Sequence, residues 1–316
     1  MKKVTVIILN WNGGEMTVKC LESLAGMESD DLVVEIVVVD NGSTDDSVEK
    51  IKNEKIKMKN DNLKLKIIEN NENLGFAEGN NVGIRYALEN RTDYVCLLNN
   101  DTRVSPDFLI QLIKVADSEK EIGTVGGKIY FEKGYEFHKD RYKEKDLGKV
   151  IWYAGGKIDW QNVYASHRGV DEVDEGQYDP PAGGTETGYV NGCLMLVKKE
   201  VFDKVGLLDP KYYLYFEEND FCQRVKRADF KLFFAPKAVI WHLNAASSGT
   251  GSSLHDYFLT RNRLLFGMRW APFHSKIALI KESVRLLISG RKWQKIGVKD
   301  FYIRKFEKGS WIENEK

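Results

Sequence analysis

VTVIILN, residues 4–10, is a short apolar run, rich in β-branched residues, that stops at the polar side chain of Asn10. A run of this length and composition is typical of a buried β-strand. Behind it, Val18, Leu21 and Leu24 recur at helical spacing. The start of the chain therefore predicts a buried strand followed by a helix.

Further strand signals follow at intervals along the chain. The apolar runs at 36–39, 65–68 and 94–98 are each closed by polar or turn-forming residues. Helical patterns separate them, and Pro106 stands where another helix is expected to begin. Because strands alternate with helices over the first ~120 residues, we expect an α/β fold with a mainly parallel central sheet flanked by helices.

The carboxyl end of every predicted strand carries amide or carboxylate side chains. In chain order these polar ends are Asn10 and Asn12, Asp40 and Asn41, residues 70–73, and residues 99–101. Ligands of open parallel sheets bind outside the carboxyl ends of the strands. The sequence therefore predicts a polar ligand site along one edge of the sheet.

Asp101 and His242 are candidate metal ligands. Asp101 comes just past a buried strand, where a carboxylate can hold Mg²⁺ or Mn²⁺ together with substrate phosphates. It can equally cap the turn before Pro106. His242 ends a β-branched run and is either a metal ligand or an ordinary structural histidine.

A second acidic group, Glu217, Glu218 and Asp220, follows an aromatic segment at 212–216. Carboxylates this close repel one another, so at least one of them could have a raised pKa suited to general-base catalysis. Alternatively, acidic residues simply favour the N-terminus of a helix. The aromatic flank would place these charges beside buried surface.

The remaining segments are less regular. Residues 132–181 have no clear period, with strand-like pieces between 151 and 168. Order returns with an apolar run at 187–197 and with two short strands that lead to Trp241. From Leu254 onward the pattern is helical.

The net charge of zero is unevenly distributed. Residues 260–316 contain 14 Lys and Arg against 5 Asp and Glu, which leaves +9 there and −9 on the rest of the chain. Within them, Ile277, Ile280, Val284 and Leu287 mark one apolar helix face. Two interpretations stay open: a basic tail that meets a membrane surface or a nucleic acid, or a helical tail packed on the acidic body.

Other classes of protein lose support. The first strand ends in residues 10–14, NWNGG, which is neither a Gly-x-Gly-x-x-Gly fingerprint nor a phosphate loop. No run approaches the roughly 18 apolar residues of a membrane span. The N-terminus lacks a signal-peptide cleavage site, and the four cysteines lack metal-ligand spacing. We therefore expect a cytoplasmic protein with reduced core thiols.

Eight motifs in this order and spacing resemble family 2 glycosyltransferases, closest to their rhamnosyltransferase-like branch, over about residues 4–270. The motifs lie at residues 6–12, 37–45, 73–83, 97–102, 192–197, 202–209, 215–224 and 241–242. The resemblance implies the GT-A fold, an inverting mechanism and a divalent cofactor, Mn²⁺ or Mg²⁺. It implies a nucleotide-sugar-binding half at 1–120, an acceptor-binding and catalytic half at 121–250, and a basic helical extension at 251–316.

The resemblance also implies roles for individual residues. Asp40 would hydrogen-bond the base of the nucleotide, while Asp101 and His242 would bind the metal. Asn99 would face the ribose or diphosphate, although an aspartate is usual at its position. The remaining nucleotide-sugar-binding residues would be Asn10, Asn12, Asn41, Ser43, Asn73, Gly75, Phe76, Asn80 and Asn100.

The family's usual Asp base is Glu218 here. Glu218 is the expected base, with Asp220 as its rival and Glu217 as the third acidic residue of the motif. The predicted reaction moves a sugar from dTDP-rhamnose or a UDP-sugar to a hydroxyl of a glycan or lipid-linked saccharide of the cell envelope. Partners would include no nucleic acid, and the basic extension could contact the inner face of the membrane. The oligomeric state is open.

Two other functions compete with this prediction. A nucleotidyltransferase would use a similar nucleotide-binding half and a carboxylate-bound metal, but a Gly-rich first loop with Arg and Lys is absent. A non-catalytic nucleotide-sugar-binding partner would account for Asn99 and Glu218, which depart from the family pattern.

Overall fold

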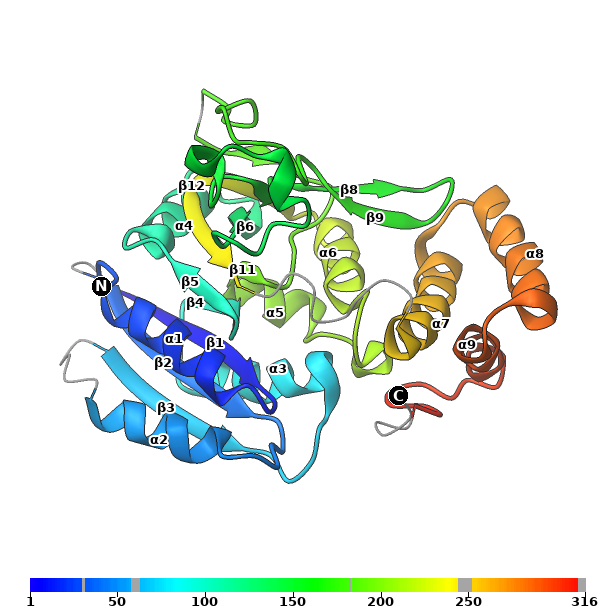
Figure 1. Cartoon of the computed structure of the whole chain (residues 1–316), viewed down its shortest axis with the longest axis horizontal. Helices are drawn as coiled ribbons and strands as arrows, with labels where there is room; N and C mark the ends of the chain where they lie inside the picture. The colour runs from blue at the N-terminus through cyan, green and yellow to red at the C-terminus, as the bar shows by residue number, and fades with distance from the viewer. Residues whose placement is uncertain (30–31, 58–62, 182, 244–251, 312–316) are drawn as a thin grey trace.

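A computed structural model describes residues 1–29, 32–57, 63–181, 183–243 and 252–311 of the chain (Figure 1). The strands are β1 (Lys2–Asn10), β2 (Leu32–Asp40), β3 (Leu63–Glu69), β4 (Tyr94–Asn99), β5 (Thr102–Val104), β6 (Ile122–Phe131), β7 (Ile151–Tyr153), β8 (Gly156–Asp159), β9 (Tyr164–His167), β10 (Thr185–Glu186), β11 (Leu194–Lys198) and β12 (Lys231–His242). The helices are α1 (Gly14–Ala25), α2 (Ser47–Lys57), α3 (Gly75–Glu89), α4 (Phe108–Ala116), α5 (Lys199–Val205), α6 (Glu217–Arg227), α7 (Ser253–Trp270), α8 (Phe273–Ser289) and α9 (Lys292–Tyr302). Short 3-10 helices span Lys139–Arg141, Glu144–Asp146 and Pro210–Tyr212.

One mixed, mainly parallel sheet runs through the body of the protein. Its strand order is β10-β12-β6-β11-β4-β1-β2-β3, with β5 beside β12 and β7 beside β6. β1 pairs in parallel with β2 and β4, and β2 with β3. β11 lies antiparallel between β4 and β6 and joins the two expected halves of the domain into one sheet. The predicted α/β sheet with flanking helices is confirmed.

The core is densest around β1, whose inner residues are fully buried. Helix α3 packs very close to this strand, because a Cβ on Gly83 would lie 2.6 Å from Ile7 Cγ2. The four cysteines are buried as free thiols. Close helix–strand packing fixes the carboxyl ends of the strands, where the polar residues lie.

The expectation of two short strands before Trp241 was wrong. A single strand, β12, runs from Lys231 to His242, with a register shift against β6 between Ala235 and Val239. Pro236 lies within the shift, and because it has no N–H to donate, the strand passes it as an irregularity. The proline made one bulged strand look like two.

Helices α7, α8 and α9 form an extension beside α6 and the β8–β9 hairpin (Figure 1). Arg261 of α7 is fully buried and donates hydrogen bonds to the backbone oxygens of Lys211, Tyr212 and Glu307. The extension thus holds the segment that leads into α6. The expected boundary between residues 250 and 251 lies outside the described residues. None of the helices described combines the length and apolarity that a membrane span requires.

Candidate active site

A cleft of ≈ 430 Å³ opens at the carboxyl edge of the sheet. The residues expected from the sequence that line it are Phe76, Asn99, Asn100, Asp101, Glu217, Glu218 and His242. Tyr215 of the aromatic segment also lines it, as do Trp152 and Asn191, which the sequence did not single out. The cleft therefore brings the candidate metal ligands and two of the candidate acids to one cavity.

Asp40 lies at the end of β2 and is almost completely buried. Its Oδ1 accepts hydrogen bonds from Asn10 Nδ2 at 2.7 Å and Ser43 Oγ at 2.6 Å, and its Oδ2 accepts from Ser43 N at 2.9 Å. The backbone N–H of Asn12 donates to Ser43 Oγ at 2.8 Å. The Asp40 carboxylate thus ties the ends of β1 and β2 together.

A second amide network surrounds Asn41. Its Nδ2 donates to Asn73 Oδ1 at 2.9 Å and to the Gly75 oxygen at 3.1 Å. Asn80 is buried in the next turn and donates to the backbone oxygen of Phe76 at 2.8 Å. Asn41, Asn73 and Asn80 therefore order the start of α3. Of the residues at this start, Phe76 lines the cleft.

Gly75 begins α3 with φ +77, and a Cβ there would lie 2.4 Å from the ring of Tyr213. That ring is stacked on Phe258 and cannot readily move. We expect Gly75→Ala to lower the free energy of unfolding by about 3 kcal/mol, because left-handed strain and overpacking add. Gly134 is the matched control, since its φ is +91 but nothing lies within 4 Å.

Urea denaturation of both variants separates the two costs. Gly134→Ala should lose only the conformational part, about 1 kcal/mol. Equal losses in the two variants would contradict the proposed clash with Tyr213.

Asp101 and His242 meet across 141 residues of sequence. His242 Nε2 lies 3.0 Å from Asp101 Oδ1, and both residues are buried. The antiparallel pairing of β5 with β12 sets them side by side, with His242 opposite Thr102. His242 Nδ1 is buried with no hydrogen-bond partner among the described residues.

This pair fits a divalent cation. A carboxylate oxygen and an imidazole nitrogen suit Mn²⁺, and a cation held by few protein ligands completes its shell with substrate phosphates and water. Among the described residues no group of three or more His, Cys, Asp and Glu could hold a metal ion. A cation here would therefore need oxygens from a bound ligand.

Glu217 and Glu218 begin α6 at the wall of the cleft. The preceding residues, Tyr213, Tyr215 and Phe216, all have positive φ. Such backbone conformations cost energy and persist where the surrounding structure imposes them. Here buried Arg261 and Asn262 hold the carbonyls of this segment.

The two glutamates have unusual proton affinities. Each has a buried Oε2 with no hydrogen-bond partner in the described part of the chain. Burial raises the pKa of Glu218 to about 7, and burial together with the charge of Glu218 raises the pKa of Glu217 well above its usual range. Glu218 can therefore exchange a proton near neutral pH.

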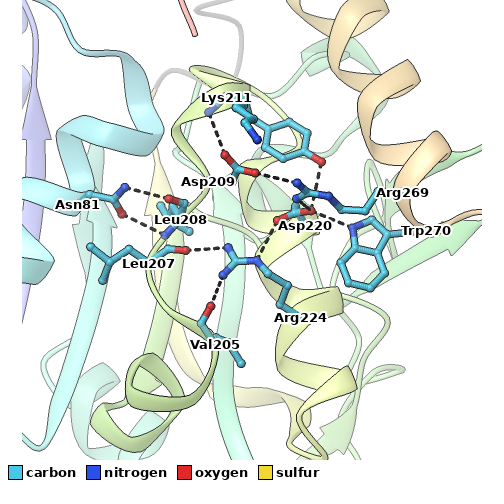
Figure 2. A network of polar contacts seen from close by, with 11 residues as sticks. Asn81, Val205, Leu207, Leu208, Asp209, Lys211, Asp220, Arg224, Arg269 and Trp270 are labelled. Carbon is cyan, nitrogen blue, oxygen red and sulfur yellow. Dashed lines mark hydrogen bonds and ion pairs between the residues drawn. The ribbon is translucent and has the colours of Figure 1, made fainter. Parts of the chain in front are cut away.

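Asp220 does not line the cleft but lies at the centre of a network between α6 and α7 (Figure 2). It is fully buried, and its Oδ1 accepts from Arg269 Nη1 at 2.6 Å, Trp270 Nε1 at 2.8 Å and Tyr212 OH at 3.2 Å. Its Oδ2 accepts from Arg224 Nε at 2.9 Å. Asp220 therefore holds α6 against α7 and is not among the residues that line the cleft.

A smaller cavity of ≈ 160 Å³ adjoins the cleft and shares Glu218 and Tyr215 with it. Strand β9 supplies Tyr164, Ala165 and His167 to its other walls, and Tyr189 also lines it. Burial lowers the pKa of His167 to about 4, so this imidazole is neutral near pH 7. Two hollows therefore meet at Glu218.

The sheet topology and the cleft at its carboxyl edge define a GT-A fold. The chain belongs to glycosyl transferase family 2, whose family model matches residues 5–206. The structure of the mannosyltransferase PcManGT from Pyrobaculum calidifontis in complex with GDP-Man and Mn²⁺ superposes with a TM-score of 0.55 at 16% identity. That match covers 95% of this chain and 74% of the other.

Sequence relatives are distant. The low-salt glycan biosynthesis hexosyltransferase Agl10 of Haloferax volcanii is 22% identical, over 72% of this chain and 63% of its own length. An N-acetylglucosaminyl-diphospho-decaprenol L-rhamnosyltransferase of Mycobacterium tuberculosis is 22% identical, over 70% of each chain. The predicted family and its rhamnosyltransferase relatives are thus confirmed.

Proposed function

We propose that this protein transfers a sugar from a nucleoside diphosphate donor to a hydroxyl acceptor with inversion of the anomeric centre. The observation that carries the proposal is Glu218, whose buried Oε2 has no hydrogen-bond partner among the described residues and which shares one cleft with the Asp101–His242 pair. Two hollows meet at this residue, as a two-substrate reaction requires.

The donor is assigned to the cleft at the sheet edge. Asp40, Asn10, Asn12, Asn41 and Ser43 would shape the nucleotide site through the two networks at the ends of β1 and β2. Asn99 and Asn100 would face the ribose and diphosphate, as would the start of α3 with Asn73, Gly75, Phe76 and Asn80.

Asp101 and His242 are the residues that would hold Mn²⁺ or Mg²⁺. A bound cation would neutralise the charge that develops on the departing diphosphate. PcManGT, whose fold this chain shares, has Mn²⁺ in its complex.

Glu218 is assigned as the general base. As the acceptor oxygen attacks the anomeric carbon, its proton passes to a Glu218 oxygen, while the bond from that carbon to the diphosphate breaks on the opposite face. Burial and the neighbouring charge of Glu218 raise the pKa of Glu217 and so favour its protonated form. Asp220 is assigned a positioning role, since it fixes α6 through Arg269 and Trp270.

The acceptor is assigned to the smaller cavity, whose aromatic walls suit a sugar ring. The named activities of the relatives favour rhamnose or another hexose as the transferred sugar and a glycan or lipid-linked saccharide as the acceptor. dTDP-rhamnose and UDP-sugars remain the proposed donors, and cell-envelope polysaccharide synthesis the proposed setting.

Calorimetric binding of the uridine, thymidine, guanosine and adenosine diphosphates, with and without Mn²⁺, tests this function. We expect one pyrimidine nucleotide to bind tightly only with Mn²⁺. Asp101→Asn should weaken that binding on the order of 10-fold or more, because it removes a charged ligand. Asp107→Asn, on the connection before α4, is the control and should bind normally. Failure of all four nucleotides to bind the folded protein would contradict the donor site.

A further inference from the structure

Helix α8 has one buried side and, on another side, exposed apolar residues. Leu279 and Ser283 face the body and are buried. The other side carries large apolar residues spaced four, three, four and four positions apart, called the α8 stripe: Phe273, Ile277, Ile280, Val284 and Ile288. Their exposed fractions run from 40% for Ile277 to 78% for Phe273. At 100° per residue the stripe occupies one narrow face of the helix.

The end of α9 lies beside α8 and carries further exposed apolar side chains. Tyr302 OH and Ser283 Oγ are 2.7 Å apart, which places Tyr302 beside α8. Tyr302 is 49% exposed, and its neighbour Ile303 is 69% exposed. Exposed apolar surface of this kind is typical of a site that binds a membrane or another protein.

The margins of the α8 stripe are cationic. Lys281 and Arg285 are exposed on α8, and Lys299 and Arg304 are exposed on and just after α9. These four side chains make no ion pair with the part of the chain that the structure describes. Glu282 is the acidic residue of α8, and it is paired with Arg263 at 2.8 Å.

The positive charge beside the α8 stripe indicates what kind of partner binds there. A second copy of this chain would bring its own cations against these cations, and like charges across an interface are destabilising. A bilayer with anionic headgroups offers both an apolar layer and opposite charge. A helix with an apolar face, flanking Lys and Arg and no capacity to span is the type that lies in the plane of the bilayer surface.

We propose that the α8 stripe, with Tyr302 and Ile303, docks onto the surface of an anionic lipid bilayer. The apolar side chains enter the boundary between headgroups and acyl chains, and Lys281, Arg285, Lys299 and Arg304 contact the headgroups. This inference concerns a surface outside the cleft and stands whether or not the proposed sugar transfer is right.

Co-sedimentation of the full chain with vesicles tests the proposal. We expect binding to phosphatidylglycerol–phosphatidylcholine vesicles, weaker at high salt, and little binding to phosphatidylcholine alone. The double variant Val284→Gln and Ile288→Gln should bind on the order of ten-fold more weakly, because two apolar side chains no longer enter the lipid. Lys281→Gln with Arg285→Gln should lose much of the preference for anionic lipid.

Matched controls come from exposed residues elsewhere. Tyr135→Gln with Val170→Gln changes exposed apolar side chains, and Lys64→Gln with Lys66→Gln changes exposed charges on β3. Both should bind vesicles like the native chain. All four double variants should bind nucleoside diphosphates as the native chain does. This result would show that the loss of vesicle binding does not come from damage to the donor site.

Two outcomes would overturn the proposal. One is equal vesicle binding by the stripe variant and its control. The other is a lipid-free dimer of the native chain that Val284→Gln and Ile288→Gln dissolve, because a second copy would then cover the stripe.

Discussion

Glu218→Gln is expected to lower the rate of sugar transfer by about 10²- to 10⁴-fold, the range that general-base catalysis supplies. The amide keeps the shape of the side chain but cannot accept the acceptor's proton. Donor binding should be unchanged, because Glu218 lies where the cleft meets the smaller cavity. Release of nucleoside diphosphate measures the rate, and calorimetry measures the binding.

Glu218 also predicts a pH dependence. Its folded pKa is raised to about 7 by burial, and the base must be ionised to act. The value of kcat/KM should therefore rise as the pH rises through about 7 and level off above it. Glu218→Asp should keep part of the activity and the pH dependence, since a carboxylate remains.

Either of two results would contradict the assignment of Glu218 as the general base. One is native transfer by Glu218→Gln. The other is loss of donor binding in step with loss of transfer, which would make Glu218 a donor ligand or a structural residue. Glu217→Gln is the neighbouring control and should have a smaller effect, because burial and the charge of Glu218 raise the pKa of Glu217 and make it a poorer proton acceptor.

Asp220→Asn is expected to have the largest effect on stability, a loss of about 3–5 kcal/mol in the free energy of unfolding. Asp220 is fully buried and neutralises Arg224 and Arg269. The amide leaves Arg224 without the carboxylate that neutralises it, while Arg269 keeps its ion pair with Asp209 at 3.0 Å. An amide N–H would also face N–H donors where the carboxylate accepts hydrogen bonds. Urea denaturation measures the loss.

Asp203→Asn is the matched control on α5. Asp203 pairs with Lys199, four residues earlier, but both side chains are about half exposed. Such surface pairs contribute about 0–1 kcal/mol, so this variant should be nearly as stable as the native chain. An Asp220→Asn protein of native stability that has lost only transfer would instead make Asp220 the base.

Much of the fold could be predicted from local pattern. Apolar runs rich in β-branched residues, such as 4–9 and 36–39, have few alternatives to buried strands, and the polar residues after them indicate the edge of the sheet where the cleft lies. The β8–β9 hairpin was only hinted at, because strands of three or four residues are too short to show a period. The single strand β12 was predicted as two short strands, because a bulge and a strand break have the same local signature.

The candidate site was predictable only in part, because local pattern does not show which distant residues meet. Asp101 and His242 were each ambiguous alone, and only the pairing of β5 with β12 brings them within 3.0 Å. Asp220 was taken for a rival base because nothing near it marks its partners. Arg269 lies 49 residues downstream on another helix, and charge patterns do not identify partners at that separation.

The sequence also did not predict which side of α8 faces the rest of the protein. Periodicity predicted an apolar face through Ile277, Ile280, Val284 and Leu287, but not that the first three would be exposed while Leu287 is half-buried. The buried side contains Ser275 and Ser283, whose small side chains allow α8 close to its neighbours. A hydrophobicity pattern alone would place those serines in solvent.

The buried charge shared by α6 and α7 restricts how this chain can be divided or recombined. A protein cut between the sheet domain and its helical extension would keep Asp220 and lose Arg269 and Trp270, and Arg261 would no longer hold Tyr212. An extension grafted from another protein would have to supply matching partners for Asp220 and Tyr212. Helix α6 and the extension are therefore one structural unit, and an exchange of either must transfer both sides of the Asp220 network together.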